Sequence, residues 1–170
     1  LGFQFVSADA ATAWVNAYYN SFVKRQEKLA DYATNPNIAV VSGFMCAETD
    51  EEAYRRASGW TFFQFALRFY ATHGTIEPGS VSLWDEYLKW CETPKGKKQR
   101  TTGLIGSPET LRRKLRKFED SNVDQVILLN QAGNNTHEDI TASLELFAEE
   151  VMPEFHAREP DHQAWKRDVL

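Results

Sequence analysis

The feature that most constrains the fold is a threefold alternation of apolar runs with amphipathic segments. Three runs are apolar almost throughout and are bounded by polar or turn-forming residues, as strands are: residues 2–7, 38–45 and 123–130. After each run, apolar side chains recur at helical spacing. Because parallel strands need a long crossover connection, this order predicts an α/β protein with a parallel sheet.

The predicted helices begin at capping sequences. Thr49 is followed three positions later by Glu52, which is the form of a capping box. Ser107, Pro108 and Glu109 supply a cap, a proline at the first helical position and an acidic first turn. Ser107 is more typical of a simple cap than of a phosphate site, although helix starts also bind phosphate. We expect one helix to reach about residue 32 and others to span about 50–72, 108–121 and 137–152, the last of them capped by Thr136.

Two segments fall outside this rhythm. The stretch from about Gly74 to Gly103 combines glycines, prolines, an aromatic run and basic residues, and we interpret it as an insertion with a mobile basic tip. After residue 155 the chain is polar and charged apart from Trp165. The sequence therefore predicts one domain over residues 1–155 and a loosely ordered tail over residues 156–170.

Composition narrows the class of protein. A length of 170 residues suits one domain, and a net charge of -5 argues against a nucleic-acid binder. No run of about 18 apolar residues and no leader sequence is present, so we expect neither a membrane span nor a secretory signal. Cys46 and Cys91 form no disulfide framework, which favours a reducing, cytoplasmic setting. Leu1 lies within a predicted strand, so we expect further residues upstream.

Histidines and serines do not indicate a catalytic site. The four histidines have no metal-ligand spacing, so no metal site is predicted. The serines lack a nucleophile-elbow context, which argues against hydrolase chemistry. Catalytic residues therefore stay unassigned.

Three short motifs follow one another towards the C-terminus. Residues 106–109 read G-S-P-E, residues 122–124 read N-V-D, and residues 143–153 read S-L-E-L-F-A-E-E-V-M-P. In this order they resemble the C-terminal end of the bacterial luciferase-like flavin-dependent monooxygenases. The resemblance extends more loosely to the two earlier predicted strands and covers nearly the whole chain.

The resemblance implies a fold and a partial site. It makes the three predicted strands the sixth, seventh and eighth of a (β/α)8 TIM barrel, so that the chain is the C-terminal portion, about three β/α units. The insertion at about 74–103 matches the lid over the flavin. In this family the main phosphate-binding groups and the usual catalytic histidine belong to earlier strands, which implies that the chain alone is inactive.

Candidate site residues follow from the barrel, whose active site lies at the C-terminal ends of the strands. The cofactor-binding candidates are Ser7, Asn130 and Gln131. The substrate and lid candidates are Phe5, Phe44, Lys97, Lys98 and Arg100. Each has an alternative, because apolar strand residues are core by default, amides after a strand serve turns, and charged loop tips are commonly only solvated.

The implied activity is that of an FMN-dependent monooxygenase, which uses reduced flavin and dioxygen on a small organic substrate, with the flavin supplied by a reductase. One alternative is an F420-dependent hydride-transfer oxidoreductase of the same superfamily. Another is a non-catalytic half-barrel binding module. Unpaired strand edges favour a homo-oligomer or pairing with the missing half barrel.

Overall fold

The computed structural model describes residues 2–4, 7–25, 27, 31, 32, 34–130, 132, 133 and 135–170. Phe5 and Gln131, two of the predicted site residues, lie outside the described residues. None of the described helices has the combined length and apolar character needed to cross a lipid bilayer.

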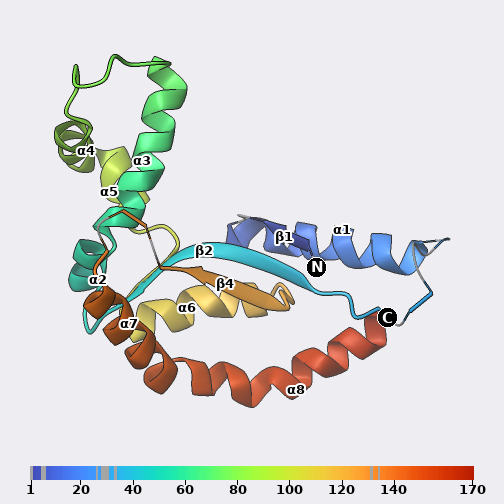
Figure 1. Cartoon of the computed structure of the whole chain (residues 1–170). Coiled ribbons are helices and arrows are strands. Elements are labelled where there is room, and N and C mark those ends of the chain that lie inside the picture. The colour runs from blue at the N-terminus through green and yellow to red at the C-terminus, as the bar shows by residue number, and fades with distance from the viewer. Residues whose placement is uncertain are drawn as a thin grey trace.

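A parallel sheet organises the molecule, and β2 is its central strand (Figure 1). The strands are β1 (Gly2–Gln4), β2 (Ile38–Cys46), β3 (Leu104–Gly106) and β4 (Gln125–Leu129). Val40 of β2 pairs with Gln4 on β1 and with Val126 on β4, so these strands flank β2 on opposite edges. The last residues of β2 pair with β3. The predicted α/β architecture with a parallel sheet is confirmed.

The strand β3 is a correction to the prediction of three strands. It is only three residues long, too short for a visible period, and lies at the end of the expected insertion. Leu104 and Ile105 are nevertheless almost fully buried. Gly103 on one side has a φ of 76° and Gly106 at its end has a φ of 151°, conformations that favour glycine. The described sheet therefore carries four strands.

Eight helices connect or follow the described strands. They are α1 (Ala8–Lys24), α2 (Asp50–Arg56), α3 (Ser58–His73), α4 (Leu83–Cys91), α5 (Pro94–Arg100), α6 (Pro108–Glu119), α7 (His137–Glu150) and α8 (Met152–Val169). The predicted caps are confirmed, since the hydroxyls of Thr49, Ser107 and Thr136 each accept a bond from a backbone amide three residues on. Two predicted helices were too long: the first ends at Lys24, and the second breaks at Ala57.

The expected mobile tip is an ordered helical arm instead (Figure 1). The helices α4 and α5 pack beside α3, and the aromatic rings of Phe62, Phe65 and Tyr87 meet with centroids 5.4 to 5.7 Å apart. Thr93 caps α5. Gly96 is buried so close to the carbonyl of Trp90 that a Cβ there would lie 2.0 Å from its oxygen. Lysines and glycine predicted a loop, but these contacts stabilise a helix.

The expected loose tail is wrong as well. The helix α8 crosses residue 155 without a break and continues to Val169, with Pro153 in its first turn and Pro160 inside it. Trp165 packs on Tyr19 with ring centroids 5.2 Å apart, and Lys166 is only 6% exposed. Polar residues of α8 pair with the rest of the protein, so a polar composition does not mean disorder here.

One acidic residue ties the start of the sheet to α1 and α8. The carboxylate of Asp124 accepts bonds from the Tyr19 hydroxyl, the Ile38 amide, His162 and Lys166 at 2.7 to 3.1 Å. Burial alone would raise the pKa of Asp124. The hydrogen bonds that its carboxylate accepts, first among them the bond from the Ile38 amide, outweigh burial and lower this pKa below its usual value. This gives a physical role to the aspartate of the N-V-D motif.

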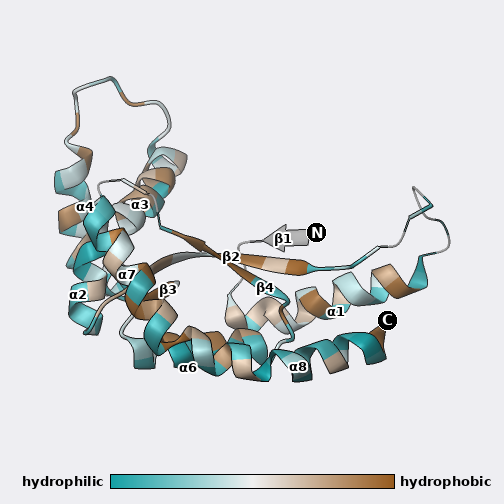
Figure 2. Ribbon diagram, turned by 60° about the horizontal axis from the view of Figure 1, so that its bottom comes forward, coloured by the Kyte–Doolittle hydropathy of each residue, from teal (hydrophilic) through white to brown (hydrophobic). Residues whose placement is uncertain are grey.

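The main core lies on one face of the sheet. Ala11 of α1, Leu111 of α6 and Phe147 of α7 form a single apolar cluster with Val40 and Phe44 of β2. These helices therefore cover the same face, and in Figure 2 α1, α6 and α8 lie together beneath the strands. Burial of this cluster is the main stabilising contribution to the body of the fold.

Candidate functional site

The C-terminal edge of the sheet is where the site residues were expected. Phe44 is 1% exposed and its ring packs edge-on against Phe147, with centroids 5.0 Å apart. It lies in the core between β2 and α7, so it has the core position that was the alternative to a substrate contact. Asn130, by contrast, directly follows β4 and is only partly buried.

The side chain of Asn130 is incompletely satisfied. Its Nδ2 donates to the Leu128 carbonyl at 3.2 Å, whereas its Oδ1 is buried and has no partner among the described residues. A buried acceptor without a donor costs about 1–3 kcal/mol. A ligand that presents an N–H at this point would remove that cost, so Asn130 is suited to bind one.

Two described residues after β4, Gly133 and Asn135, lie against the start of α3. Asn135 donates from Nδ2 to the Asn130 carbonyl at 2.9 Å and accepts at Oδ1 from the Gly59 amide at 3.2 Å. A Cβ at Gly133, whose φ is 60°, would lie 2.8 Å from the Gly59 Cα. Asn135 thus positions Asn130. The sequence suggested only a loop here, because the bridge joins residues far apart in the chain.

Trp60 covers the C-terminal ends of β2 and β4. It is 5% exposed and belongs to a cluster with Met45, Ile105 and Leu129. Its indole lies on Gly43, where a Cβ would come within 2.0 Å of Nε1, so only glycine allows this position. Sequence reasoning missed Trp60, because an aromatic residue inside a helix carries no signal that it reaches over a strand.

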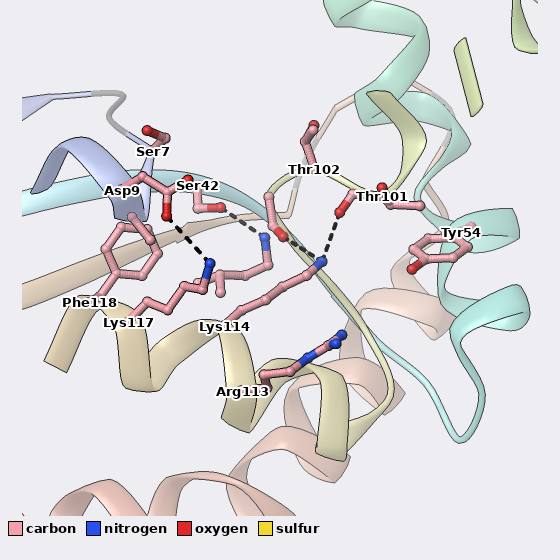
Figure 3. A pocket seen from close by; sticks show the side chains of 13 residues that line it. Ser7, Asp9, Ser42, Tyr54, Thr101, Thr102, Arg113, Lys114, Lys117 and Phe118 are labelled. Carbon is pink, nitrogen blue, oxygen red and sulfur yellow. Dashed lines mark hydrogen bonds and ion pairs between the residues drawn. The ribbon is translucent and has the colours of Figure 1, made fainter. Parts of the chain in front are cut away.

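A cleft of about 500 Å³ opens between the start of α1 and α6 (Figure 3). It is lined by Ser7, Ala8, Asp9, Ser42, Tyr54, Thr101, Thr102, Gly103, Leu104, Arg113, Lys114, Lys117 and Phe118. Of the two predicted cofactor-binding residues that the structure describes, Ser7 lines this cleft and Asn130 does not. Ser7 is the N-cap of α1, is exposed, and makes no capping bond with its hydroxyl.

Lys114 is the most constrained cation of the cleft. Its Nζ donates to the carbonyls of Thr101, Gly103 and Ile105 at 2.7 to 2.9 Å, as the dashed lines in Figure 3 partly show. Burial lowers the pKa of Lys114 to about 8. The side chain thereby fastens the segment that returns from the helical arm to β3.

The predicted lid residues lie on the arm. Lys97 is 62% exposed and pairs loosely with Glu92 at 3.4 Å, and Lys98 is exposed too. Arg100 is partly buried at the end of α5, immediately before the threonines that line the cleft. The structure therefore groups these three on one helix but does not bring them to Asn130.

The start of α6 is closed to a ligand by Asp50. Its carboxylate accepts from the Ser107 amide at 2.7 Å and from the Thr110 hydroxyl at 3.0 Å. Burial alone would raise the pKa of Asp50, but these hydrogen bonds outweigh burial and lower it. The carboxylate thus occupies the place of an anion at this helix start, so Ser107 acts as a cap.

Solved structures support the fold, whereas sequence comparisons find no relative: no protein-family model and no characterised protein sequence matches the chain. Among solved structures, it is similar to the monooxygenase RslO1 from Streptomyces bottropensis, with 16% identity, a TM-score of 0.56 and coverage of 90% of this chain and 41% of that one. The chain has the fold of part of a luciferase-like barrel.

Two further structures show the range of that fold. One is the oxygenating constituent of 3,6-diketocamphane monooxygenase from Pseudomonas putida in complex with FMN, at 20% identity and a TM-score of 0.57, with coverage of 89% and 47%. The other is the coenzyme F420 dependent tetrahydromethanopterin reductase from Methanopyrus kandleri, at 14% identity and 0.52, with coverage of 88% and 43%. The chain spans less than half the length of these structures, as a partial barrel does.

Proposed function

We propose that this chain is the C-terminal part of an FMN-dependent monooxygenase acting on a small organic substrate. The observation that carries the proposal is the fold shared with the FMN complex of 3,6-diketocamphane monooxygenase. The motifs around the G-S-P-E helix start and the S-L-E-L-F close support the same family. The coarser conclusion, a flavin-type oxidoreductase fold, does not depend on the choice of cofactor.

Two features at the end of β4 support a flavin as the cofactor. The buried Oδ1 of Asn130 lacks a donor, and the edge of a flavin ring carries an N–H. Trp60 and Met45 form an apolar cluster with Leu129, the residue before Asn130. Ser7 and Gln131 remain cofactor-binding candidates, and Phe5 remains a substrate candidate. Phe44 contributes through packing of the strand that carries Met45.

The division of labour would be that of cofactor enzymes in general. Bound reduced FMN supplies the electrons with which dioxygen is activated for insertion into the substrate. Asn130 would help to hold the bound flavin, because Asn135 fixes its backbone. The apolar cluster around Trp60 would exclude water from this end of the sheet, which would limit wasteful side reactions. The resemblance implies that the catalytic residue belongs to an earlier strand of the barrel.

F420-dependent hydride transfer is the second candidate, because the reductase from Methanopyrus kandleri shares the fold at a TM-score of 0.52. A non-catalytic half-barrel module is the third. It is supported by β4, none of whose residues is fully buried and which pairs with β2 alone among the described strands. Such an edge favours pairing with a complementary half barrel or with a second copy.

Flavin binding tests the proposal directly. We would titrate the protein that contains this chain with FMN and with F420 and follow quenching of cofactor fluorescence. FMN should bind more tightly, and Asn130→Ala should weaken it by about fivefold to thirtyfold, as expected for one lost hydrogen bond to a buried group. Asn20→Ala, on the exposed face of α1, is the matched control. Preference for F420 would favour the second candidate, and binding of neither would leave the half-barrel module.

A lid role for the arm predicts an effect on turnover rather than on affinity. Changing Lys97 and Lys98 together to Ala should slow substrate turnover several-fold while the FMN affinity stays within about twofold, because a lid acts on closure. Turnover is measured with FMN reduced by a separate reductase. Lys24→Ala, at the exposed end of α1, is the control. Equal losses in turnover and affinity would show that the two lysines act as ligand contacts instead.

A cellular location forms part of the same proposal. Both cysteines are free and buried, and burial raises the pKa of Cys46 to about 11, so it is an inert thiol. We propose a cytoplasmic, reducing location and a separate reductase that supplies the flavin.

A further inference from the structure

The cleft between α1 and α6 concentrates positive charge. Arg113, Lys114 and Lys117 project into it from α6, and among the described residues of its lining Asp9 alone is acidic (Figure 3). The protein as a whole has a net charge of -5, so this local excess of cations runs against its average. Like charges gathered at one cleft repel each other, and an anion between them would relieve that cost.

The three cations divide into one fixed charge and two weakly held donors, since Arg113 donates only a long bond of 3.4 Å to the Thr110 hydroxyl. Lys114 spends all its hydrogens on backbone carbonyls, so it contributes a charge at the wall of the cleft. Lys117 and Arg113 are exposed. The contact of Lys117 with Asp9 is 3.4 Å long between side chains that are 58% and 86% exposed, and such pairs contribute little. Both residues therefore can turn towards a ligand.

Neutral donors complete the cleft. The hydroxyl of Ser7 makes no bond to the helix that it precedes, and the phenol of Tyr54 lies at the opposite side. The start of α1, a helix of 17 residues, adds the positive end of its dipole beside these side chains. This combination of two mobile cations, a fixed cation and hydroxyl groups is the donor set that phosphate recognition uses.

We propose that this cleft binds the phosphate group of a small phosphorylated ligand. A phosphate monoester carries close to two negative charges at neutral pH and offers three acceptor oxygens, which matches the donors of the cleft. Two sources share this chemistry, the phosphate of the flavin and a free phosphate or other phosphorylated metabolite. The inference rests on the cleft alone and holds whether or not the flavin is that ligand.

The test compares FMN, riboflavin and inorganic phosphate by calorimetry at low ionic strength. FMN should bind at least about tenfold more tightly than riboflavin, and phosphate should compete with FMN. The double variant Lys117→Gln, Arg113→Gln should lose at least about tenfold in affinity for FMN and phosphate while riboflavin binding is unchanged. Lys24→Gln removes one charge far from the cleft and should change neither. Circular dichroism checks that the variants remain folded.

Each outcome separates this inference from the proposed function. Equal binding of FMN and riboflavin, with no binding of phosphate, overturns the phosphate cleft and leaves the flavin function standing. Phosphate binding that depends on Lys117 and Arg113, without binding of either flavin, supports the cleft and counts against the flavin function. Failure of all three ligands to bind overturns both.

Discussion

The strands β2 and β4 are alike in sequence but differ in burial. Both are apolar runs, yet every residue of β2 except Val41 is buried, whereas no residue of β4 is. The difference comes from their neighbours, because β2 pairs with three strands and β4 with β2 alone among those described. An apolar run therefore predicts a strand, but its burial depends on what lies beside it. The open side of β4 is suited to pairing with further strands. This chain covers only 47% of the FMN-complexed structure of the same fold, which is correspondingly longer.

Truncation in β2 should have the largest effect. We expect Phe44→Ala to lower the free energy of unfolding by about 4 kcal/mol, because it removes a fully buried ring packed on Phe147 and leaves a cavity. Urea unfolding followed by circular dichroism measures the loss. Leu144→Ala, at a side chain that is 40% exposed, is the control and should cost far less. Equal losses would mean that β2 is not the centre of the core.

The ionic tie between the starts of β2 and β4 comes next. We expect Asp124→Asn to cost about 3 kcal/mol, because Lys166 would be left buried without its counter-charge. Since the pKa of Asp124 is lowered in the folded state, its contribution is complete above about pH 4 and is lost as the pH falls further. Unfolding curves at several pH values measure this. Asp120→Asn, at an exposed position, should show neither effect.

The matching truncation in β4 should cost less than that in β2. Leu128 faces the same core as Phe44 but is only partly buried, so Leu128→Ala should lower the free energy of unfolding by about 1–2 kcal/mol. The measurement is again urea unfolding. A loss as large as that of Phe44→Ala would show that β4 is covered in solution, by a second copy or by a complementary half barrel.

The smallest expected effect is a pH dependence from Lys114. Its pKa in the folded state is about 8, below the usual value of 10.5, so the unfolded chain binds more protons between these two values. Stability should therefore rise with pH in that window, by up to about 1 kcal/mol between pH 8 and pH 9. Lys114→Met should remove this rise, while Lys117→Met should keep it. If Lys114→Met left the dependence of stability on pH unchanged, the three carbonyls would stabilise the charged ammonium as well as water does.

Local signals predicted the elements that local chemistry decides. The caps at Thr49, Ser107 and Thr136 were visible because a hydroxyl and the amide it accepts from lie within four residues. Asn130 was a site candidate because it follows a strand. Trp60 and Lys114 were not, because their contacts with Gly43 and with three distant carbonyls depend on how the chain folds back.

By itself, the sequence determined the α/β class, two of the longer strands, the starts of α2, α6 and α7 and the likeness to a luciferase-like barrel, because periodicity, caps and short motifs are properties of neighbouring residues. Tertiary structure alone decided the order of α8, the helical arm, the short strand β3 and the cationic cleft. In each case, partners from distant segments overrode weak local preferences. Asp124 pairs with Lys166 of α8, the rings of α3 pack against the arm, β2 pairs with Leu104, and the start of α1 lies across the cleft from the cations of α6.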